Sequence, residues 1–372
     1  MYCKINTIFS CISHTSISLL HIFVIIAKKH EMTHNLKDRT YLHERHRLSH
    51  QQIDTLLGEN RCKEFLKEKL SILESVKNFI AVVDFLNLNN IRVVSLKGPM
   101  LSNRIYGDPA VRLSHDIDLL IDKKNIEVCH NLMLSKGFRL SHGIVWPENK
   151  TKQKLLVSSL HHLSYYSKGL NCYVELHWEL MHNLPVSWEV ASGIIDNNIV
   201  ETEFYGKKIY LLSKEMELLF LMMHGAKHGW SRLKWLVDIN DYPSGDIDIV
   251  KFNSLVKRFK AERIVTQTNI LLKKFFDKEL PFTGKNLIDK YLISYPLKSI
   301  EDKISTAISM KNHLKNLRYS LLLFSDISYK IKIIKSYAFR SSDLNVFNSK
   351  YKFVYYIYHP YSLIKRRIFY AR

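Results

Sequence analysis

The alternation of apolar and polar positions divides the chain into a mixed first part and a helical second part. Between residues 61 and 88, apolar side chains recur every three or four positions, which predicts a long amphipathic helix. Short apolar runs predict strands at 91–96, 116–121, 159–167 and 171–178, and a hairpin at Gly206 that ends near residue 212. From Ser213, a predicted N-cap, the spacing is mostly helical. The pattern therefore predicts an α/β (α+β) fold, with a mixed sheet and flanking helices followed by a mostly helical C-terminal domain.

Capping residues place two helices between these strands. A short helix from Pro99 to Tyr106 follows the first strand, because proline is favoured in the first turn and a Gly-Asp-Pro break comes directly afterwards. Asp122 is the predicted N-cap of a helix that runs to Lys136 and stops at Gly137. Both helices therefore connect strands of one sheet.

At 372 residues the chain is long enough for one large domain or two ordinary ones. We predict three parts, an N-terminal extension, a mixed domain and a helical domain, at residues 1–45, 46–212 and 213–372. The apolar run at 16–27 is too short to span a bilayer comfortably and lacks the layout of a signal peptide. It is either a membrane-surface contact or part of an upstream extension, with Met32 as the working start.

The net charge indicates which classes of partner are favoured, and the cysteines indicate the redox compartment. The 55 Lys and Arg exceed the 35 Asp and Glu by 20, which favours polyanions, nucleotides or anionic lipid without choosing among them. An ordinary solvated basic surface is equally compatible with this excess. The five cysteines are scattered, odd in number and lack any CxxC spacing. We therefore expect a reduced, cytoplasmic setting.

Two aspartates one residue apart, Asp116 and Asp118, are the most informative feature of the chain. In an extended strand both carboxylates project from the same face, while the apolar residues between and after them turn into the core. Two adjacent carboxylates repel each other, so a cation must neutralise them, and oxygen ligands suit Mg²⁺ and Mn²⁺. The pair is therefore predicted to form half of a metal site.

A third carboxylate, Glu175, lies in the strand-like segment YVELHW, where Tyr173, Glu175 and His177 share a face. Three carboxylates on neighbouring strands, a glycine at a strand-to-helix turn and a basic surround are what two-metal phosphoryl transfer requires. One ion then activates an attacking hydroxyl and the other stabilises the departing pyrophosphate.

Five segments carry a more specific pattern: LKGPML, YGDPAVRLSHDIDLLI, YVELHWEL, HGAKHGWSRLKWLVDI from 224 to 239, and the closing FVYYIYHPYSLIKR. Together these segments resemble the nucleotidyltransferase superfamily of the DNA polymerase beta type. The resemblance is closer to its bacterial branch of uncharacterised nucleotidyltransferases. It covers roughly residues 60 to 366 and implies a nucleotidyltransferase fold.

The resemblance implies that Asp116 and Asp118 are paired metal ligands and that Glu175 is the third carboxylate. It also implies that Gly98 lies at the turn that cradles a nucleoside triphosphate such as ATP. The superfamily signature has a second Gly or Ser after that glycine, whereas this chain has Pro99. Because proline has no N–H, this departure removes one backbone donor to phosphate.

Lys97, Arg112 and Ser114 are the candidate phosphate-binding side chains around this turn. Lys97 offers a point charge and Arg112 a bidentate fork, although either is also compatible with an ordinary surface charge. Ser114 either donates to phosphate or caps the turn that leads into the strand.

Two further patterns have structural interpretations that we prefer. His224 and His228, four apart on a predicted helix, have zinc-ligand spacing, but no glutamate follows His224, so helix packing and a buried polar network are favoured. Asp246 and Asp248 repeat the spacing of the aspartate pair at a predicted helix start. Asp246 is there the expected N-cap and Asp248 a first-turn charge.

These observations lead to one functional hypothesis and one alternative. The hypothesis is a Mg²⁺- or Mn²⁺-dependent nucleotidyltransferase that moves a nucleoside monophosphate from a nucleoside triphosphate to a hydroxyl acceptor and releases pyrophosphate. The acceptor is a small molecule, an RNA or a protein. The alternative is a noncatalytic protein on the same fold that binds RNA, protein or membrane through its basic surface.

Overall fold

The computed structural model describes the central part of the chain: residues 36, 38–59, 62–282, 284, 288–302, 310–337, 351, 353–354, 357–358 and 361. The predicted membrane-surface segment at 16–27 lies outside the described residues. Met32 and most of the closing motif also lie outside them. None of the helices in the described part is long and apolar enough to cross a membrane.

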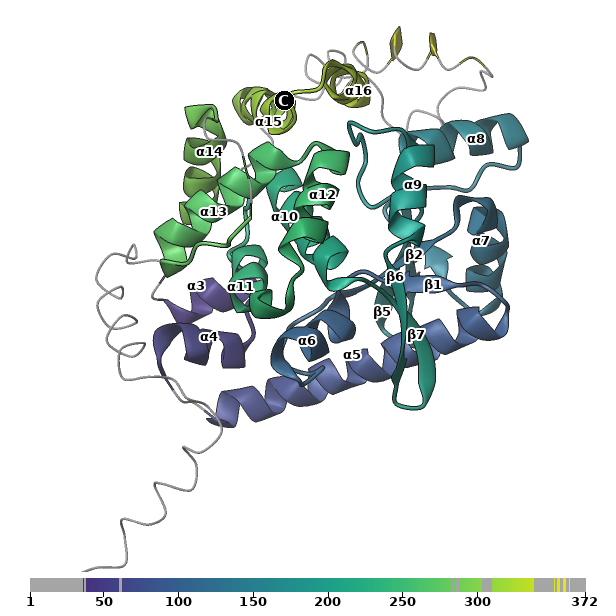
Figure 1. Cartoon of the computed structure of the whole chain (residues 1–372). Coiled ribbons are helices and arrows are strands. Elements are labelled where there is room, and N and C mark those ends of the chain that lie inside the picture. The colour runs from purple at the N-terminus through teal and green to yellow at the C-terminus, as the bar shows by residue number, and fades with distance from the viewer. Residues whose placement is uncertain are drawn as a thin grey trace, which may run out of the picture.

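A seven-stranded mixed sheet forms the centre of the fold (Figure 1). Its strand order is β3-β4-β5-β2-β1-β7-β6, with β2 parallel to β5, β1 parallel to β7, and the other neighbours antiparallel. The strands are β1 (Val93–Ser95), β2 (Asp116–Ile121), β3 (Arg139–Leu140), β4 (His162–Ser167), β5 (Cys172–His177), β6 (Ile199–Phe204) and β7 (Lys207–Leu212). The mixed sheet predicted from the sequence is therefore confirmed.

Helices flank the sheet and form most of the described chain that follows it. Those up to the end of the sheet are α3 (Arg39–Glu44), α4 (His50–Leu57), α5 (Cys62–Leu88), α6 (Gly98–Tyr106), α7 (Ile126–Ser135), α8 (Lys150–Ser159) and α9 (Trp188–Asp196). The later ones are α10 (Lys214–Lys227), α11 (Lys234–Asp241), α12 (Ile249–Phe259), α13 (Glu262–Phe276), α14 (Lys290–Glu301), α15 (Met310–Leu323) and α16 (Ile327–Tyr337). The prediction of a helical C-terminal part is thus confirmed.

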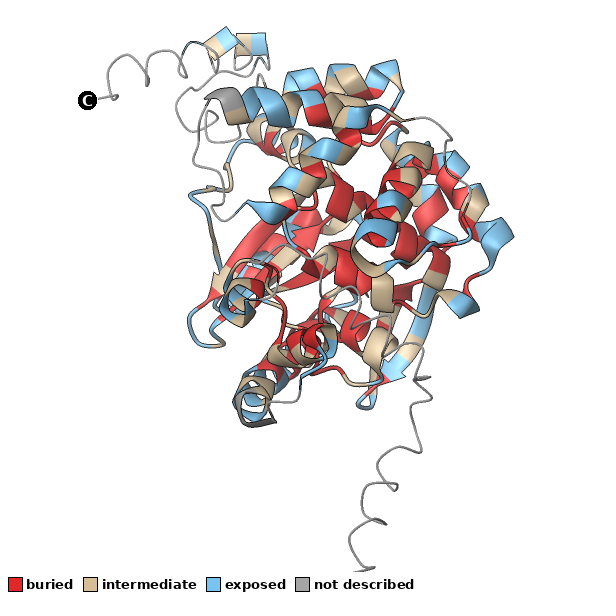
Figure 2. Cartoon of the chain, turned by 90° about the vertical axis from the view of Figure 1, so that its left-hand side faces the viewer, coloured by how far each residue is buried: buried red, intermediate tan, exposed pale blue. Residues whose placement is uncertain are grey.

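The two faces of the sheet pack against different helices, as the period-2 alternation of strands requires. Ile117 and Leu119 of β2 are buried with residues of α5 and α7. Leu120 points the other way and is buried with α9, α10 and the later helices. The ribbon of buried residues accordingly runs through the strands and through the helices that pack on them (Figure 2). Asp116 and Asp118, which alternate with Ile117 and Leu119, therefore project from the face that the C-terminal helices cover.

One hydrophobic core joins the parts that we predict as separate domains. It contains Leu42 and Ile53 of the N-terminal helices, Val94 and Leu120 of the sheet, and buried residues of α10 to α16. Ser213 caps α10 by accepting a hydrogen bond from the backbone N–H of Met216. The boundary near residue 212 stays a prediction.

One of two predicted capping residues is observed, at a 3₁₀ turn just before its helix, and the other is not. Asp122 caps a short 3₁₀ turn at Lys123–Asn125 that leads directly into α7. The N-cap of α12 is Asp248, whose carboxylate accepts from the backbone N–H of Lys251. The prediction of Asp246 as this N-cap is therefore wrong, because residues 244–246 form a separate 3₁₀ turn before the helix starts.

Candidate active site

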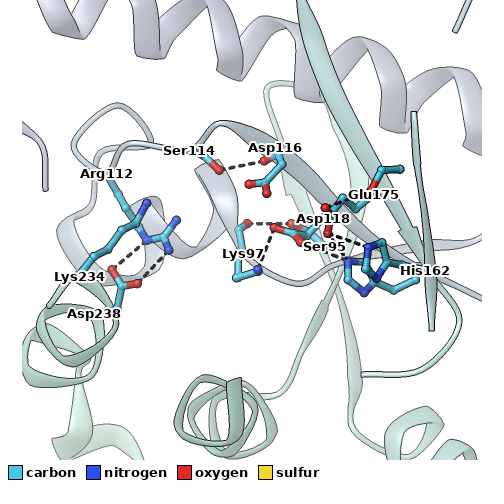
Figure 3. A network of polar contacts seen from close by, with 12 residues as sticks. Ser95, Lys97, Arg112, Ser114, Asp116, Asp118, His162, Glu175, Lys234 and Asp238 are labelled. Carbon is cyan, nitrogen blue, oxygen red and sulfur yellow. Dashed lines mark hydrogen bonds and ion pairs between the residues drawn. The ribbon is translucent and has the colours of Figure 1, made fainter. Parts of the chain in front are cut away.

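Parallel pairing of β2 and β5 brings two of the predicted carboxylates together. Asp118 lies opposite Glu175 in the register of these strands, and the two side chains share one face of the sheet (Figure 3). Asp118 is buried, whereas Glu175 is partly exposed. An acidic cluster thus forms where the sheet faces the C-terminal helices.

Lys97 supplies the counter-charge to this cluster. Its Nζ lies 3.1 Å from Oδ2 of Asp118 and its side chain is nearly buried. Burial alone would lower the pKa of Lys97, but the carboxylates around it, Asp118 foremost, raise that pKa above its ordinary value. Lys97 is therefore a fixed positive charge at the candidate site.

The two aspartates of the pair are held in different electrostatic states. Burial would raise the pKa of Asp118, but Lys97 and His177 lower it below the ordinary value. The Asp118 carboxylate and burial together raise the pKa of Asp116, and the opposing effect of Lys97 is too small to reverse that rise. The like-charge repulsion expected from the sequence therefore raises the pKa of Asp116 and not that of Asp118.

The turn after β1 has the geometry expected of an anion-binding loop. Gly98 has a φ of +67°, a left-handed conformation that favours glycine, and it opens α6. Lys97, the N-cap of this helix, makes no side-chain capping hydrogen bond, and Pro99 occupies the first turn. Ser114 faces the turn and donates its Oγ–H to the carbonyl of Asp116 at 2.9 Å. Backbone N–H groups at such a helix start favour a negative charge.

Arg112 is engaged elsewhere. Its Nε and one terminal nitrogen donate to the two carboxylate oxygens of Asp238 on α11, at 2.8 and 2.9 Å. Both side chains are buried. Burial lowers the pKa of Arg112, but the Asp238 carboxylate and its hydrogen bonds raise it, and the resulting pKa lies above the ordinary value. The bidentate fork expected for phosphate thus joins the sheet domain to α11. A role of Arg112 toward phosphate stays a prediction.

The comparison with protein families agrees with this geometry. A family described as uncharacterised nucleotidyltransferase matches residues 26–277, which is more than half of the chain. The chain belongs to this family. No curated protein matches it. The resemblance read from the sequence is confirmed at the level of the family, and the family indicates nucleotidyl transfer with a nucleoside triphosphate substrate and a divalent metal.

The residues present fit a divalent cation, as this family requires. Ligand atoms of Asp118, Glu175 and His177 all lie within 4.8 Å of one another. The nitrogen of His177 that faces both carboxylates is Nε2. Asp116 is not part of that trio, although it lies beside it (Figure 3). The donor set therefore includes an imidazole that the sequence hypothesis did not assign.

Strand alternation alone predicts that His177 shares the face of Glu175, but its contacts depend on the fold. Its Nε2 lies 3.2 Å from Asp118 and 3.3 Å from Glu175. Burial would lower the pKa of His177, but these two carboxylates raise it. His162, across the β4–β5 pair from His177, adds a second imidazole.

Two further lysines at the site escaped the sequence analysis. Lys234 of α11 is buried and donates to the carbonyl of Leu113, and burial followed by Arg112 lowers its pKa well below the ordinary value. Lys227 of α10 lies 3.0 Å from Nε2 of His161, and burial lowers its pKa to about 8. Both lie in the segment from 224 to 239 that carried part of the resemblance, which was the available signal.

The packing interpretation agrees with the contacts of His224, which is partly buried, whereas His228 is exposed. Their rings lie 4.7 Å apart and each contacts Trp235, at 5.6 and 5.2 Å between centroids. Trp230 is fully buried and Asp238 forms the buried pair with Arg112, so this segment supplies the packed and polar interior expected of it.

A cavity of about 240 Å³ lies between Asp116 and α5. Its wall includes Ser75 of α5, Pro99, Ser114 and Tyr173. Because Pro99 lines it, the cavity lies next to the turn at Gly98. It provides space for a ligand next to the aspartate pair.

Proposed function

We propose that the protein is a Mg²⁺- or Mn²⁺-dependent nucleotidyltransferase that moves a nucleoside monophosphate to a hydroxyl acceptor and releases pyrophosphate. The observation that carries the proposal is the set formed by Asp118, Glu175 and Lys97 beside the glycine turn at Gly98. Membership of a nucleotidyltransferase family supports it. The acceptor is a small molecule, an RNA or a protein, and we propose a cytoplasmic location.

Each part of the site has a role in this proposal. Asp116, Asp118 and Glu175 would hold the divalent metal, which when bound polarises the phosphates and lowers the pKa of the acceptor hydroxyl. Lys97 and the uncapped start of α6 at Gly98 would bind the triphosphate, with Ser114 beside them. Pro99 leaves this helix start one N–H donor short, so Lys97 carries more of the phosphate binding than in the general signature.

The C-terminal helices would select the acceptor. The carboxylates project toward α10 and α11, which contribute Lys227 and Lys234 to the same region. These helices therefore form the second wall of the site. An acceptor hydroxyl has to enter between them and the sheet.

Nucleotide binding is tested by thermal unfolding of the full chain with each nucleoside triphosphate, with and without Mg²⁺. We expect one or more nucleotides to raise the melting temperature only when Mg²⁺ is present, because a ligand of the folded state stabilises it by about 2.7 kcal/mol at a hundred times its Kd. Asp118→Asn should abolish the shift. The matched control is Asp246→Asn, because this carboxylate is exposed and pairs with Lys214 at the surface.

Absence of a shift with every nucleotide would contradict the proposal and favour the noncatalytic alternative. Binding to RNA or anionic vesicles that weakens steeply with salt, and that Asp118→Asn leaves unchanged, would then identify the basic surface as the functional one.

A further inference from the structure

We propose that His161, His162 and His177 form a second metal site, for a transition-metal ion such as Zn²⁺, directly beside the candidate catalytic carboxylates. The site is a property of these imidazoles, and it does not require that the protein transfer nucleotides. It shares His177 with the acidic cluster, so the two sites would be mechanically linked.

The topology of the sheet brings the three rings together. His162 is the antiparallel partner of His177 in the β4–β5 register, so both side chains lie on one face. His161 comes just before β4, where the strand alternation does not yet apply, and its carbonyl accepts from the backbone N–H of Trp178 at 3.0 Å. That hydrogen bond fixes His161 beside the same end of β5.

The distances suit one ion. One nitrogen from each of the three rings lies within 4.8 Å of the other two. Nε2 of His161 and Nδ1 of His162 are 3.2 Å apart. Two imidazole ligands of a tetrahedral Zn²⁺ have nitrogens about 3.3 Å apart, given Zn–N bonds of about 2.05 Å.

The two nitrogens of His177 have different surroundings. Nε2 contacts the carboxylates of Asp118 and Glu175, whereas Nδ1 is buried and has no hydrogen-bond partner. A histidine that binds a metal through one nitrogen commonly donates its other N–H to a carboxylate, which orients the ring and strengthens the ligand. His177 already has the carboxylate half of this arrangement, so Nδ1 is the atom left for the ion.

The ligand chemistry favours a transition metal over Mg²⁺. Three imidazoles are borderline-soft nitrogen donors, which suit Zn²⁺ and its neighbours, while Mg²⁺ keeps oxygen ligands. Three protein ligands leave a fourth position open to water or to a phosphate oxygen. An ion held there would fix His177 and, through it, the orientation of Asp118 and Glu175.

Lys227 would compete with the metal ion for His161. Its Nζ lies 3.0 Å from Nε2 of His161, the atom that would bind the ion. Metal binding must therefore displace this ammonium group from His161. Removal of the Lys227 charge should strengthen metal binding, whereas a purely structural histidine cluster predicts no such gain.

The test is Zn²⁺ titration of the chelator-stripped full chain against a chromophoric chelator, with Co²⁺ absorption as the second readout. We expect the wild type to bind one more equivalent of Zn²⁺ than His162→Gln, or to bind it at least tenfold more tightly. The Co²⁺ spectrum should show nitrogen ligation that His162→Gln lacks. His313→Gln, at an exposed position on α15, should match the wild type, and Lys227→Met should bind at least tenfold more tightly.

Equal Zn²⁺ binding by the wild type and by both His162→Gln and His161→Gln would overturn the site, as would a wild type that binds no Zn²⁺. Unchanged melting of the histidine variants in chelator shows that they fold, and the second variant serves if the first does not. Asp116→Asn, which lies outside the imidazole trio, should retain Zn²⁺. A wild type that binds no Zn²⁺ but shows Mg²⁺-dependent nucleotide binding would refute only this inference. A wild type that binds Zn²⁺ at the histidines but binds no nucleotide would refute only the proposed function.

Discussion

Asp118→Asn is expected to lower the rate of pyrophosphate release by about a thousandfold or more, equivalent to about 4 kcal/mol of transition-state stabilisation. Asp118 is the buried carboxylate that faces Glu175 across the β2–β5 pair and contacts both Lys97 and His177. Asparagine keeps the shape but removes the negative charge that would hold the metal. The rate is measured with a coupled pyrophosphate assay at saturating Mg²⁺ and nucleotide.

Folding of this variant must be checked separately, because it leaves Lys97 and His177 facing a neutral group. Circular dichroism melting of Asp118→Asn should show a folded protein, and Asp246→Asn should keep the wild-type rate. A folded Asp118→Asn with at least a tenth of the wild-type rate would exclude Asp118 as a metal ligand for the reaction.

Arg112→Met and Asp238→Leu are each expected to destabilise the protein by about 3–5 kcal/mol, because each leaves one buried charge without its partner. The pair is bidentate, with hydrogen bonds of 2.8 and 2.9 Å, and both side chains are almost completely buried. Urea unfolding measures the loss. The double variant should recover most of the stability, since no buried charge then remains unpaired.

The matched control is the exposed pair of Lys208 and Glu201, whose nitrogen and oxygen lie 2.7 Å apart but whose side chains are 54% and 53% exposed. Lys208→Met should change the free energy of unfolding by less than about 1 kcal/mol. Single Arg112 and Asp238 variants that lose no more than this control would show that the pair does not hold α11 to the sheet.

The strands and the long helices were predictable from the sequence because they depend on local periodicity. Ile117 and Leu119 alternate with the two aspartates, and this alone places the carboxylates on one face. The error at α12 was also local. Asp246 and Asp248 are both good N-caps, and only the backbone shows that a 3₁₀ turn separates the first from the helix.

The contacts of the site were less predictable because they join distant parts of the chain. Asp238 is 126 residues from Arg112, so no spacing rule indicates that the arginine is already paired. His162 and His177 become neighbours only through the β4–β5 register. Lys227 reaches His161 only because α10 packs over the sheet. Residue type predicted the chemistry of these side chains, and the tertiary fold decided their partners.

The central claim is that the α-phosphate of a nucleoside triphosphate, with its nucleoside, is transferred to a hydroxyl acceptor. It is tested most directly with α- and γ-labelled nucleotides, incubated with the protein, Mg²⁺ and the small-molecule, RNA or protein fraction of a cell extract. We predict that the α label enters one fraction while the γ label leaves as pyrophosphate. With Asp118→Asn, we predict neither transfer of the α label nor release of labelled pyrophosphate. Transfer of the γ label, or no α label in any fraction, would contradict the account.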